Sequence, residues 1–426
     1  MKSTSIFRLF TLGIMLVTIA GCEYDDYPDA VWDPDATGGA TPQITSVDPP
    51  DVVYDGLSTI TITGENFSPV LNQNQVTFNG VVAEINTDLS SPTQLVLTMP
   101  IIITDAALNF VTDVQIMVAV QGAYSGAVYA HDFRVERAVI EWGGFSADKP
   151  LKEPNAIACD SDGNAYVAGG GSDKILYKID TAGVRTEFGS GLASITRDLK
   201  VGPGGAVFYA RNNPFVYRIP PEGGTGVASP RIKSKIACFD FNVDQNIYAS
   251  GKNDSIYFYD TVAGTVKGVA DSEDYTYTTL RVYDGYVYVA GIYEGADTNV
   301  TVTQAVWRHE ILADDMLGAK ELVYDWASYE YAAEQSILTM LVNSEGLFYL
   351  GVSEGTGPAI INLDISTQEV TPFYDAVLIS PATHLTWGPD NFLFCVREMA
   401  APTDAVPTAA FRIAQTKTSA PNYGRD

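Results

Sequence analysis

Short runs of alternating hydrophobic and polar residues recur along most of this chain, and glycine, asparagine, aspartate or proline separates one run from the next. Residues 58–63 and 94–98 are clear examples. Alternation with a period of two is typical of β-strands that bury one face, and the separating residues favour tight turns. The pattern therefore predicts an all-β protein built from short strands.

One strand-like segment with a bulky residue at its centre occurs six times, with a spacing of 40 residues at first and 50 to 54 residues later. The central residues are Tyr177, Tyr217, Tyr257, Trp307, Ile361 and Phe411. A period near 40 with strand-forming residues is typical of a β-propeller, in which each repeat forms a four-stranded blade that buries its faces against its neighbours. We therefore predict a six-bladed β-propeller over residues 137–426.

The sequence also suggests how the ring closes. No outer strand is evident after Phe411, whereas residues 139–145, before the first repeat, read like residues 185–189 at the end of the first repeat. We predict that residues 139–145 supply the outer strand of the last blade. Such closure protects sheet edges that would otherwise pair with other chains.

Two stretches resemble known families. Residues 42–136, with the segment from Thr61 to Phe67 as the signature, resemble the IPT/TIG immunoglobulin-like domain. Gly64 and Asn66 are expected to adopt positive φ, and Phe67 to fill the space between two sheets. The resemblance implies a β-sandwich that serves as a spacer or a binding module, and we expect a spacer.

Residues 154–167 resemble an NHL repeat, and the later units resemble it with decay. This likeness implies a six-bladed propeller of the NHL and gluconolactonase-like superfamily. It implies no activity, because propellers include both enzymes and scaffolds.

The N-terminal residues indicate where in the cell the protein is located. Residues 1–21 combine Lys2 and Arg8 with a short apolar run that ends in small residues, which is typical of a signal peptide. Ile19 to Cys22 resembles the lipobox of bacterial lipoproteins, so Cys22 is expected to carry lipid; an ordinary signal peptide is the alternative. Residues 22–41 are acidic and lack periodicity, which predicts a flexible tether. The acidic start resembles an export signal to the outer face of the outer membrane, with periplasmic facing as the alternative.

A formal net charge of −27 makes nucleic acid a poor partner and leaves the lipid on Cys22 as the sole predicted contact with membrane. Three histidines and four cysteines show no metal-ligand spacing, and neither a metal nor a cofactor is predicted. Cys159, Cys238 and Cys395 fall in different repeats, and we expect no disulfide among them. The spacing of Asp160, Asp162 and Asn164 suggests calcium only superficially, and we expect a turn there.

An enzyme is the third-ranked interpretation. Gluconolactonase-like propellers use acidic and amide side chains around a divalent ion in the central funnel. Glu153 and Asn155 are possible counterparts, but the corresponding positions of the other repeats supply no matching set. We therefore identify no catalytic residue, and a propeller hydrolase or lyase stays an alternative.

A binding role has more support, because aromatic residues gather in two segments that we place outside the strand cores. The ligand-binding candidates are Tyr275, Tyr277, Trp326, Tyr329 and Tyr331, with Arg197 near the start of the second repeat. Aromatic faces beside carboxylates and amides suit sugar rings, and they also suit protein partners. We expect glycan binding, with a protein scaffold of an outer-membrane complex as the alternative. Tyrosines that merely cover blade edges are the competing structural interpretation.

Overall fold

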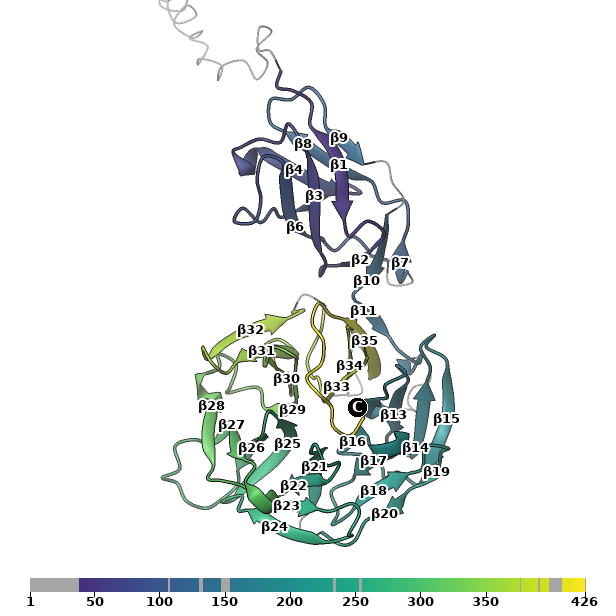
Figure 1. The fold of residues 1–426 in the computed structure, drawn as a ribbon, viewed down its shortest axis with the longest axis vertical. Helices are drawn as coiled ribbons and strands as arrows, with labels where there is room; N and C mark the ends of the chain where they lie inside the picture. Colours follow the sequence, from purple (N-terminus) through teal and green to yellow (C-terminus); the bar gives the residue numbers. More distant parts are fainter. Residues whose placement is uncertain are drawn as a thin grey trace, which may run out of the picture. The chain divides into compact units, whose positions relative to one another are not determined.

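The computed structural model describes residues 38–105, 108–129, 133–146, 154–232, 235–252, 255–375, 377–389, 391–397 and 408–425. These residues form β-strands joined by turns and a few 3-10 turns (Figure 1). The 3-10 turns are η1 (Leu71–Gln73), η3 (Pro203–Gly205), η4 (Ala313–Asp315) and η5 (Trp326–Ser328). The predicted all-β fold class is confirmed. No helix in the described part of the chain is long and apolar enough to span a membrane.

Six sheets are arranged in a ring in the C-terminal part of the described chain, which confirms the six-bladed propeller (Figure 1). Blade one contains β12 (Pro154–Cys159), β13 (Ala165–Gly169), β14 (Ile175–Ile179) and β15 (Arg185–Ser190), with β19 (Gly224–Thr225) added at its edge. Blade two contains β16 (Asp198–Val201), β17 (Val207–Ala210), β18 (Val216–Ile219) and β20 (Val227–Ala228). Blade three contains β21 (Ile236–Phe241), β22 (Ile247–Gly251), β23 (Ile256–Tyr259) and β24 (Val266–Ala270).

The remaining blades follow the same antiparallel order. Blade four contains β25 (Tyr275–Tyr283), β26 (Tyr286–Tyr293), β27 (Gln304–Glu310) and β28 (Glu321–Asp325). Blade five contains β29 (Ile337–Val342), β30 (Phe348–Val352), β31 (Ile360–Asp364) and β32 (Glu369–Phe373). Blade six contains β33 (His384–Trp387), β34 (Phe392–Arg397), β35 (Ala409–Ala414) and, from before blade one, β11 (Val139–Glu141).

The ring closes as predicted. Strand β11 pairs antiparallel with β35, with Ile140 opposite Arg412 and Glu141 opposite Phe411. One blade is thus built from the two ends of the repeat region, so opening the ring requires breaking the hydrogen bonds of this ladder.

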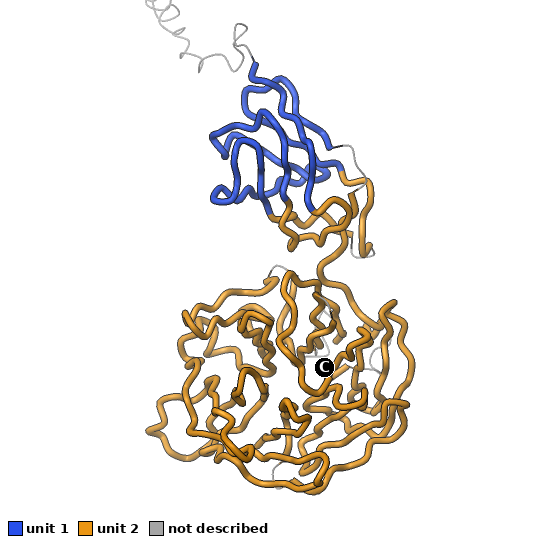
Figure 2. Tube along the Cα trace, viewed as in Figure 1, with its two compact units in different colours: residues 1–48, 61–97, 115–131 blue, residues 49–60, 98–114, 132–426 orange. Residues whose placement is uncertain are grey.

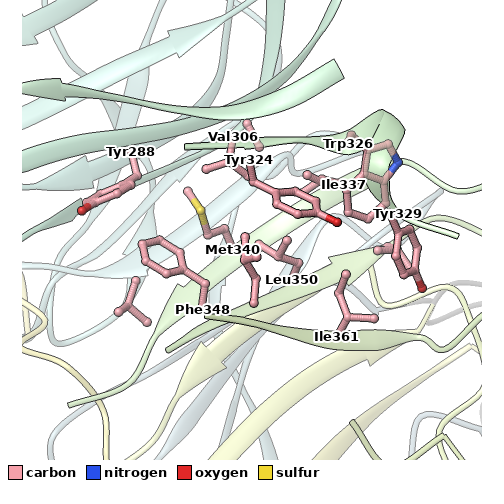
Figure 3. Packing of buried hydrophobic residues seen from close by; sticks show 14 of the residues in the cluster. Tyr288, Val306, Tyr324, Trp326, Tyr329, Ile337, Met340, Phe348, Leu350 and Ile361 are labelled. Atoms are coloured by element: carbon pink, nitrogen blue, oxygen red, sulfur yellow. The ribbon is translucent and has the colours of Figure 1, made fainter. Parts of the chain in front are cut away.

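The recurring bulky residue lies on the third strand of each blade and is buried in the first five, from Tyr177 to Ile361, and half-buried at Phe411. Hydrophobic clusters join neighbouring blades. One of them combines Tyr288 and Val306 of blade four with Met340, Phe348 and Ile361 of blade five (Figure 3). This packing is why one blade alone cannot be stable: its faces are covered only by its neighbours.

In two hairpin turns, an aspartate or asparagine side chain accepts hydrogen bonds from backbone N–H groups of the turn. The Asp160 carboxylate accepts hydrogen bonds from the backbone N–H of Asp162, at 3.1 Å, and of Asn164, at 2.8 Å. Asn242 accepts in the same way from Asp244 and Asn246 in blade three. The turn expected at Asp160 is therefore present, and its carboxylate is committed to stabilising the backbone.

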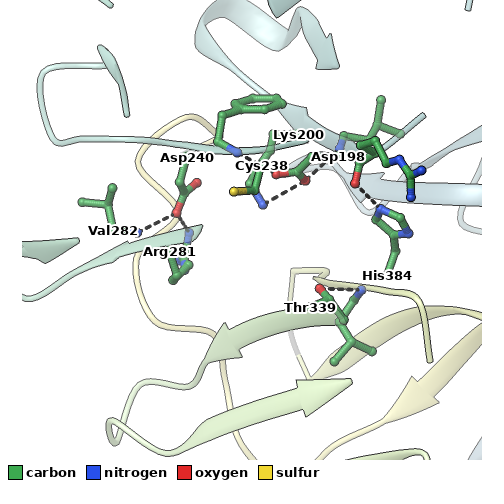
Figure 4. A network of polar contacts seen from close by, with 12 residues as sticks. Asp198, Lys200, Cys238, Asp240, Arg281, Val282, Thr339 and His384 are labelled. Carbon is green, nitrogen blue, oxygen red and sulfur yellow. Dashed lines mark hydrogen bonds and ion pairs between the residues drawn. The ribbon is translucent and has the colours of Figure 1, made fainter. Parts of the chain in front are cut away.

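Inner strands are also joined from blade to blade by two carboxylates, the half-buried Asp198 and the buried Asp240 (Figure 4). Asp198 of blade two accepts from the backbone N–H of Phe239 in blade three, at 2.9 Å. Asp240 of blade three accepts from the Arg281 guanidinium, at 2.7 Å, and from the backbone N–H of Val282, at 2.9 Å, both in blade four. A buried carboxylate needs such partners, so these contacts fix the positions of adjacent blades.

The C-terminal segment after β35 binds three blades and ends within the outline of the ring (Figure 1). Arg281 of blade four donates to the Pro421 carbonyl, at 2.7 Å. The backbone N–H of Ser344, next to blade five, donates to the Thr418 carbonyl, and Arg425 donates to the Trp387 carbonyl of blade six. This segment therefore adds a second set of contacts between blades.

The chain divides into two compact units (Figure 2): residues 1–48, 61–97 and 115–131 form unit 1, and residues 49–60, 98–114 and 132–426 form unit 2. The immunoglobulin-like fold has three sheets. The first contains β1 (Gln43–Asp48), β3 (Thr59–Glu65) and β6 (Gln94–Thr98). The second contains β5 (Val81–Ala83), β4 (Asn74–Phe78), β8 (Ile116–Val120) and β9 (Ala127–Tyr129). The third contains β2 (Val52–Asp55), β10 (Arg134–Arg137) and β7 (Phe110–Val111). The third sheet belongs to unit 2.

The signature residues of this domain have structural roles, with one correction. Phe67 is 4% exposed, and Asn66 adopts a φ of 61° as expected. Gly64 is not in the positive-φ region. Glycine is needed at this position because a side chain has no room: a Cβ would lie 2.0 Å from the Gln43 carbonyl oxygen and 2.4 Å from Cζ of Phe67.

The three cysteines of the propeller are buried free thiols. Burial raises the pKa of the Cys159 and Cys395 thiols to about 12 and also raises that of Cys238. They are thus uncharged at neutral pH and pack as small hydrophobic residues.

Candidate functional site: a tyrosine groove on blades four and five

A groove of about 620 Å³ lies where the segment after β28 meets blade five. Blade four and its following segment contribute Tyr324, Ser328, Tyr329, Glu330 and Tyr331. The region of blade five contributes Pro358, Ile361, Gln368, Val370, Pro372 and Asp375. A concave surface of this size, with aromatic walls and a few polar groups, has the properties of a small-ligand site. We call it the tyrosine groove.

The segment after β28 is held by its own hydrogen bonds. The Asp325 side chain accepts from the backbone N–H of Ala327, at 3.0 Å, which caps the short η5 turn. This turn directs Trp326 inward, where it is 1% exposed and donates its Nε1–H to the Gln335 carbonyl, at 2.7 Å. The indole therefore forms the support of the groove and offers no face to a ligand.

Three aromatic rings lead outward from this support. The centroid of Trp326 lies 4.6 Å from that of Tyr329, and Tyr329 lies 5.6 Å from Tyr331. Figure 3 shows Trp326 and Tyr329 next to each other at one end of this cluster, near Ile337 and Ile361. Exposure increases along the series, from Trp326 through Tyr329 at 8% to the half-buried Tyr331. Tyr331 is thus the most accessible ring of the three.

The opposite wall is fixed by Gln335. Its side-chain amide nitrogen lies within hydrogen-bond distance of the carbonyls of Ser353, Gly357 and Pro358, at 3.2 to 3.3 Å. Gly357 approaches closely: a Cβ at this position would lie 2.4 Å from Oε1 of Gln335 and 2.6 Å from Cγ of Tyr331. The loop that carries Pro358 is therefore set against Tyr331 by contacts that only glycine permits.

Polar side chains accompany the aromatic rings in the lining of the groove. Burial raises the pKa of Tyr329 to about 12, so its hydroxyl stays protonated, and this hydroxyl has no partner among the described residues. The Gln368 side chain donates to the carbonyls of Val323 and Ile365, which orients its amide. Glu330 is exposed and adds a carboxylate. Buried donors without partners are uncommon in folded proteins, which makes the Tyr329 hydroxyl notable.

The structure separates the six predicted ligand residues. Tyr329 and Tyr331 line the tyrosine groove, and Trp326 lies beneath it. Tyr275 and Tyr277 do not lie outside the strands, as the sequence interpretation assumed: both are within β25, at 7% and 0% exposed. Tyr275 packs its ring 4.4 Å from that of Trp307 and donates to the Val302 carbonyl, which are packing roles.

Arg197 is exposed directly before β16 of blade two and is not among the residues of the groove. Its backbone carbonyl accepts a hydrogen bond from Nε2 of His384 in blade six, at 2.6 Å (Figure 4). Burial lowers the pKa of His384 to about 4, so the imidazole is neutral at neutral pH and Nε2 carries the proton. This contact joins the inner strands of two blades.

The residues that the sequence interpretation missed come from blade five, namely Pro358, Gln368, Pro372 and Asp375. They lie more than 25 positions after Tyr331 in the sequence, and no local pattern marks them. Of the possible funnel residues, Asn155 is buried and donates to the Ser194 carbonyl, and Glu153 lies outside the described residues. In the described ranges, no group of three or more His, Cys, Asp or Glu side chains could hold a metal ion.

Comparison with known proteins identifies the first domain. The family model of the IPT/TIG domain matches residues 42–134, which confirms the resemblance noted in this part of the sequence. No curated protein matches the chain.

Solved structures with a similar course of the chain include a protein of unknown function from Bacteroides thetaiotaomicron VPI-5482, with 14% identity, a TM-score of 0.48, and coverage of 90% of this chain and 100% of that chain. An auxiliary nutrient binding protein from the same organism has 13% identity and a TM-score of 0.47, and the match covers 90% of this chain and 99% of that chain. A gluconolactonase from Xanthomonas campestris has 11% identity and a TM-score of 0.46, with 62% of this chain and 86% of that chain covered. Similarity of this extent carries no inference about function.

Proposed function

We propose that the protein is a lipid-anchored cell-surface binding protein that captures glycan in the tyrosine groove, with the immunoglobulin-like domain as a spacer. The observation that carries this proposal is the half-buried ring of Tyr331 beside the Tyr329 hydroxyl, which has no hydrogen-bond partner among the described residues. A pyranose ring has an apolar face that packs on an aromatic ring, and hydroxyls around its edge that exchange hydrogen bonds. The oriented amide of Gln368 and the carboxylate of Glu330 supply further partners for such hydroxyls.

The proposed location rests on the lipobox resemblance at Cys22, which lies outside the described residues. Lipid on Cys22 would hold the chain at a membrane although its net charge of −27 disfavours contact with anionic headgroups. Cys22→Ala is expected to move the protein from the membrane fraction to the soluble fraction of its host cells. Membrane association that survives this substitution would contradict the lipid anchor.

The glycan proposal is tested by affinity electrophoresis of the full chain through gels that contain starch, xylan or mannan. We expect at least one polysaccharide to retard the protein. Tyr331→Ala should weaken that retardation about tenfold, since loss of an aromatic anchor at a binding site costs more than 1 kcal/mol. Tyr331→Phe keeps the ring face and should retain most of the effect.

Tyr124→Ala is the matched control, because Tyr124 is 79% exposed and belongs to unit 1. Its mobility in each gel should equal that of the unmodified protein. Equal retardation of Tyr331→Ala and the unmodified protein would remove the tyrosine groove as the glycan site, and no retardation in any of the gels would count against glycan capture.

A further inference from the structure

Blade six carries an arginine that lacks the counter-charge of its counterpart in blade four. Arg308 follows the central bulky residue of β27, and its Nε lies 2.8 Å from Oε2 of Glu321, directly opposite on β28. Arg412 follows the central residue of β35 in the same way, but the residue opposite it is Ile140 of β11. Because β11 comes from before the first repeat, closing the ring places an apolar residue where blade four has a carboxylate.

The Arg412 guanidinium is nevertheless held firmly. It lies 4.3 Å from the ring centroid of Trp142 and 4.5 Å from that of Phe392. Among the described residues it has no hydrogen-bond or ion-pair partner. Aromatic contacts use the faces of a guanidinium and leave its N–H groups, which lie in the plane of the group, for an acceptor.

Arg412 lines a pocket of about 290 Å³. The other charged residues of its lining are Arg134, Arg137 and Glu136, and Ile140 and Trp142 also line it. All of these residues belong to unit 2. Arg134 pairs through Nη2 with Glu136, at 2.8 Å, and Arg137 donates to the Leu108 and Asp105 carbonyls. Formal charges in the pocket therefore sum to a positive value, although the whole chain is strongly negative.

Two further donors in the pocket lining are buried without a partner in the part of the chain that the structure describes. They are Nε of Arg134 and Nε1 of Trp142, whose side chain is 6% exposed. An N–H group that is removed from water and left unpaired costs free energy, so an acceptor that reached these groups would bind favourably. Glu136 lies in the same pocket and attracts Arg412, but it is ion-paired with Arg134. Within the described residues, the Arg412 guanidinium forms no ion pair and two N–H groups of the pocket residues have no acceptor, so all of them favour an anionic ligand.

We infer that this pocket binds an oxyanion carried by a small acidic molecule, a carboxylate or sulfate group of the kind found on uronic acids and sulfated sugars. A guanidinium pairs with carboxylate and sulfate oxygens through parallel N–H groups. The volume is near the lower end of the range for small-molecule pockets, about 300 to 1,000 Å³, and suits a ligand of about one sugar residue. The site is separate from the tyrosine groove, so its test is independent of glycan capture there.

Titration calorimetry of the full chain with glucuronate, sodium sulfate and glucose tests this inference at low ionic strength. We expect saturable binding of glucuronate, of sulfate or of both, and no binding of glucose. Arg412→Gln should weaken binding at least tenfold, since hydrogen bonds to charged groups contribute about 1.5–3 kcal/mol. Raised salt should also weaken binding.

Arg218→Gln is the matched control: Arg218 occupies the equivalent position in β18, is exposed, and faces an apolar residue, Val227. It changes the net charge by the same amount and should bind as the unmodified protein does. Thermal unfolding of both variants checks that they are folded. Absence of saturable anion binding by the folded unmodified protein, or equal affinity of Arg412→Gln and Arg218→Gln, would overturn the inference. Sulfate binding without glucuronate binding would support a sulfate-bearing ligand, and the reverse a carboxylate-bearing one.

Discussion

Alanine in place of Asp240 is expected to lower the free energy of unfolding of the propeller by about 3–5 kcal/mol, the usual cost of removing one partner of a buried ion pair. Asp240 is 0% exposed, and Arg281 is 2% exposed. The substitution leaves the Arg281 guanidinium buried without its carboxylate and removes the acceptor of the Val282 N–H. Denaturation followed by tryptophan fluorescence measures the loss, because Trp142, Trp307, Trp326 and Trp387 all lie in the propeller.

Two further variants distinguish the effect of losing the ion pair between Asp240 and Arg281 from a nonspecific loss of stability. Asp244→Ala, on the exposed turn after β21, should change stability by no more than about 0.5 kcal/mol. The double variant Asp240→Leu with Arg281→Met should lose less than Asp240→Ala alone, since apolar replacement of both partners leaves no unpaired charge. Wild-type stability of Asp240→Ala would show that the contact between blades three and four does not depend on this carboxylate.

Trp326→Ala is expected to destabilise the propeller by about 3–5 kcal/mol, as removal of a large buried aromatic side chain does. The indole packs with Tyr324 and Tyr329 and donates to Gln335, so its loss leaves a cavity beneath the tyrosine groove. Trp326→Phe keeps much of the packing and should lose less. Chemical denaturation of the full chain measures both.

This effect differs from that of Tyr331→Ala, which should leave stability within about 0.5 kcal/mol of the unmodified protein because Tyr331 is only half-buried. If Trp326→Ala were as stable as the unmodified protein and lost only ligand binding, Trp326 would be a contact residue and its buried position would be incorrect. Stability and binding together therefore distinguish a residue that supports the groove from one that touches the ligand.

Much of the architecture follows from local and repeated patterns. The six bulky positions mark the third strand of each blade, because a blade buries its neighbours' side chains at the same place in every repeat. The similarity of residues 139–145 to residues 185–189 predicted the closing strand, since both positions need the same outer-strand pattern. Asp160 was recognisable as part of a turn because the interaction of its side chain with the backbone is confined to a few residues.

Surface accessibility was not recognisable in this way. Tyr275, Tyr277 and Trp326 look like loop aromatics in the sequence, yet each is covered by a neighbouring strand or segment. The polarity of a residue can be read from the sequence, whereas the exposure of its side chain depends on which distant segment packs over it.

The repeat, the number of blades, the closing strand and the IPT/TIG domain could be predicted from the sequence, because each leaves a recognisable pattern of hydrophobic and polar positions in its own segment of the chain. Only the folded chain shows that Tyr331 joins Pro358 and Gln368 in one groove, and that the residue opposite Arg412 is Ile140 instead of a carboxylate. Both results depend on contacts between residues far apart in the chain, and the side chain opposite a given position is fixed only when the blades are assembled.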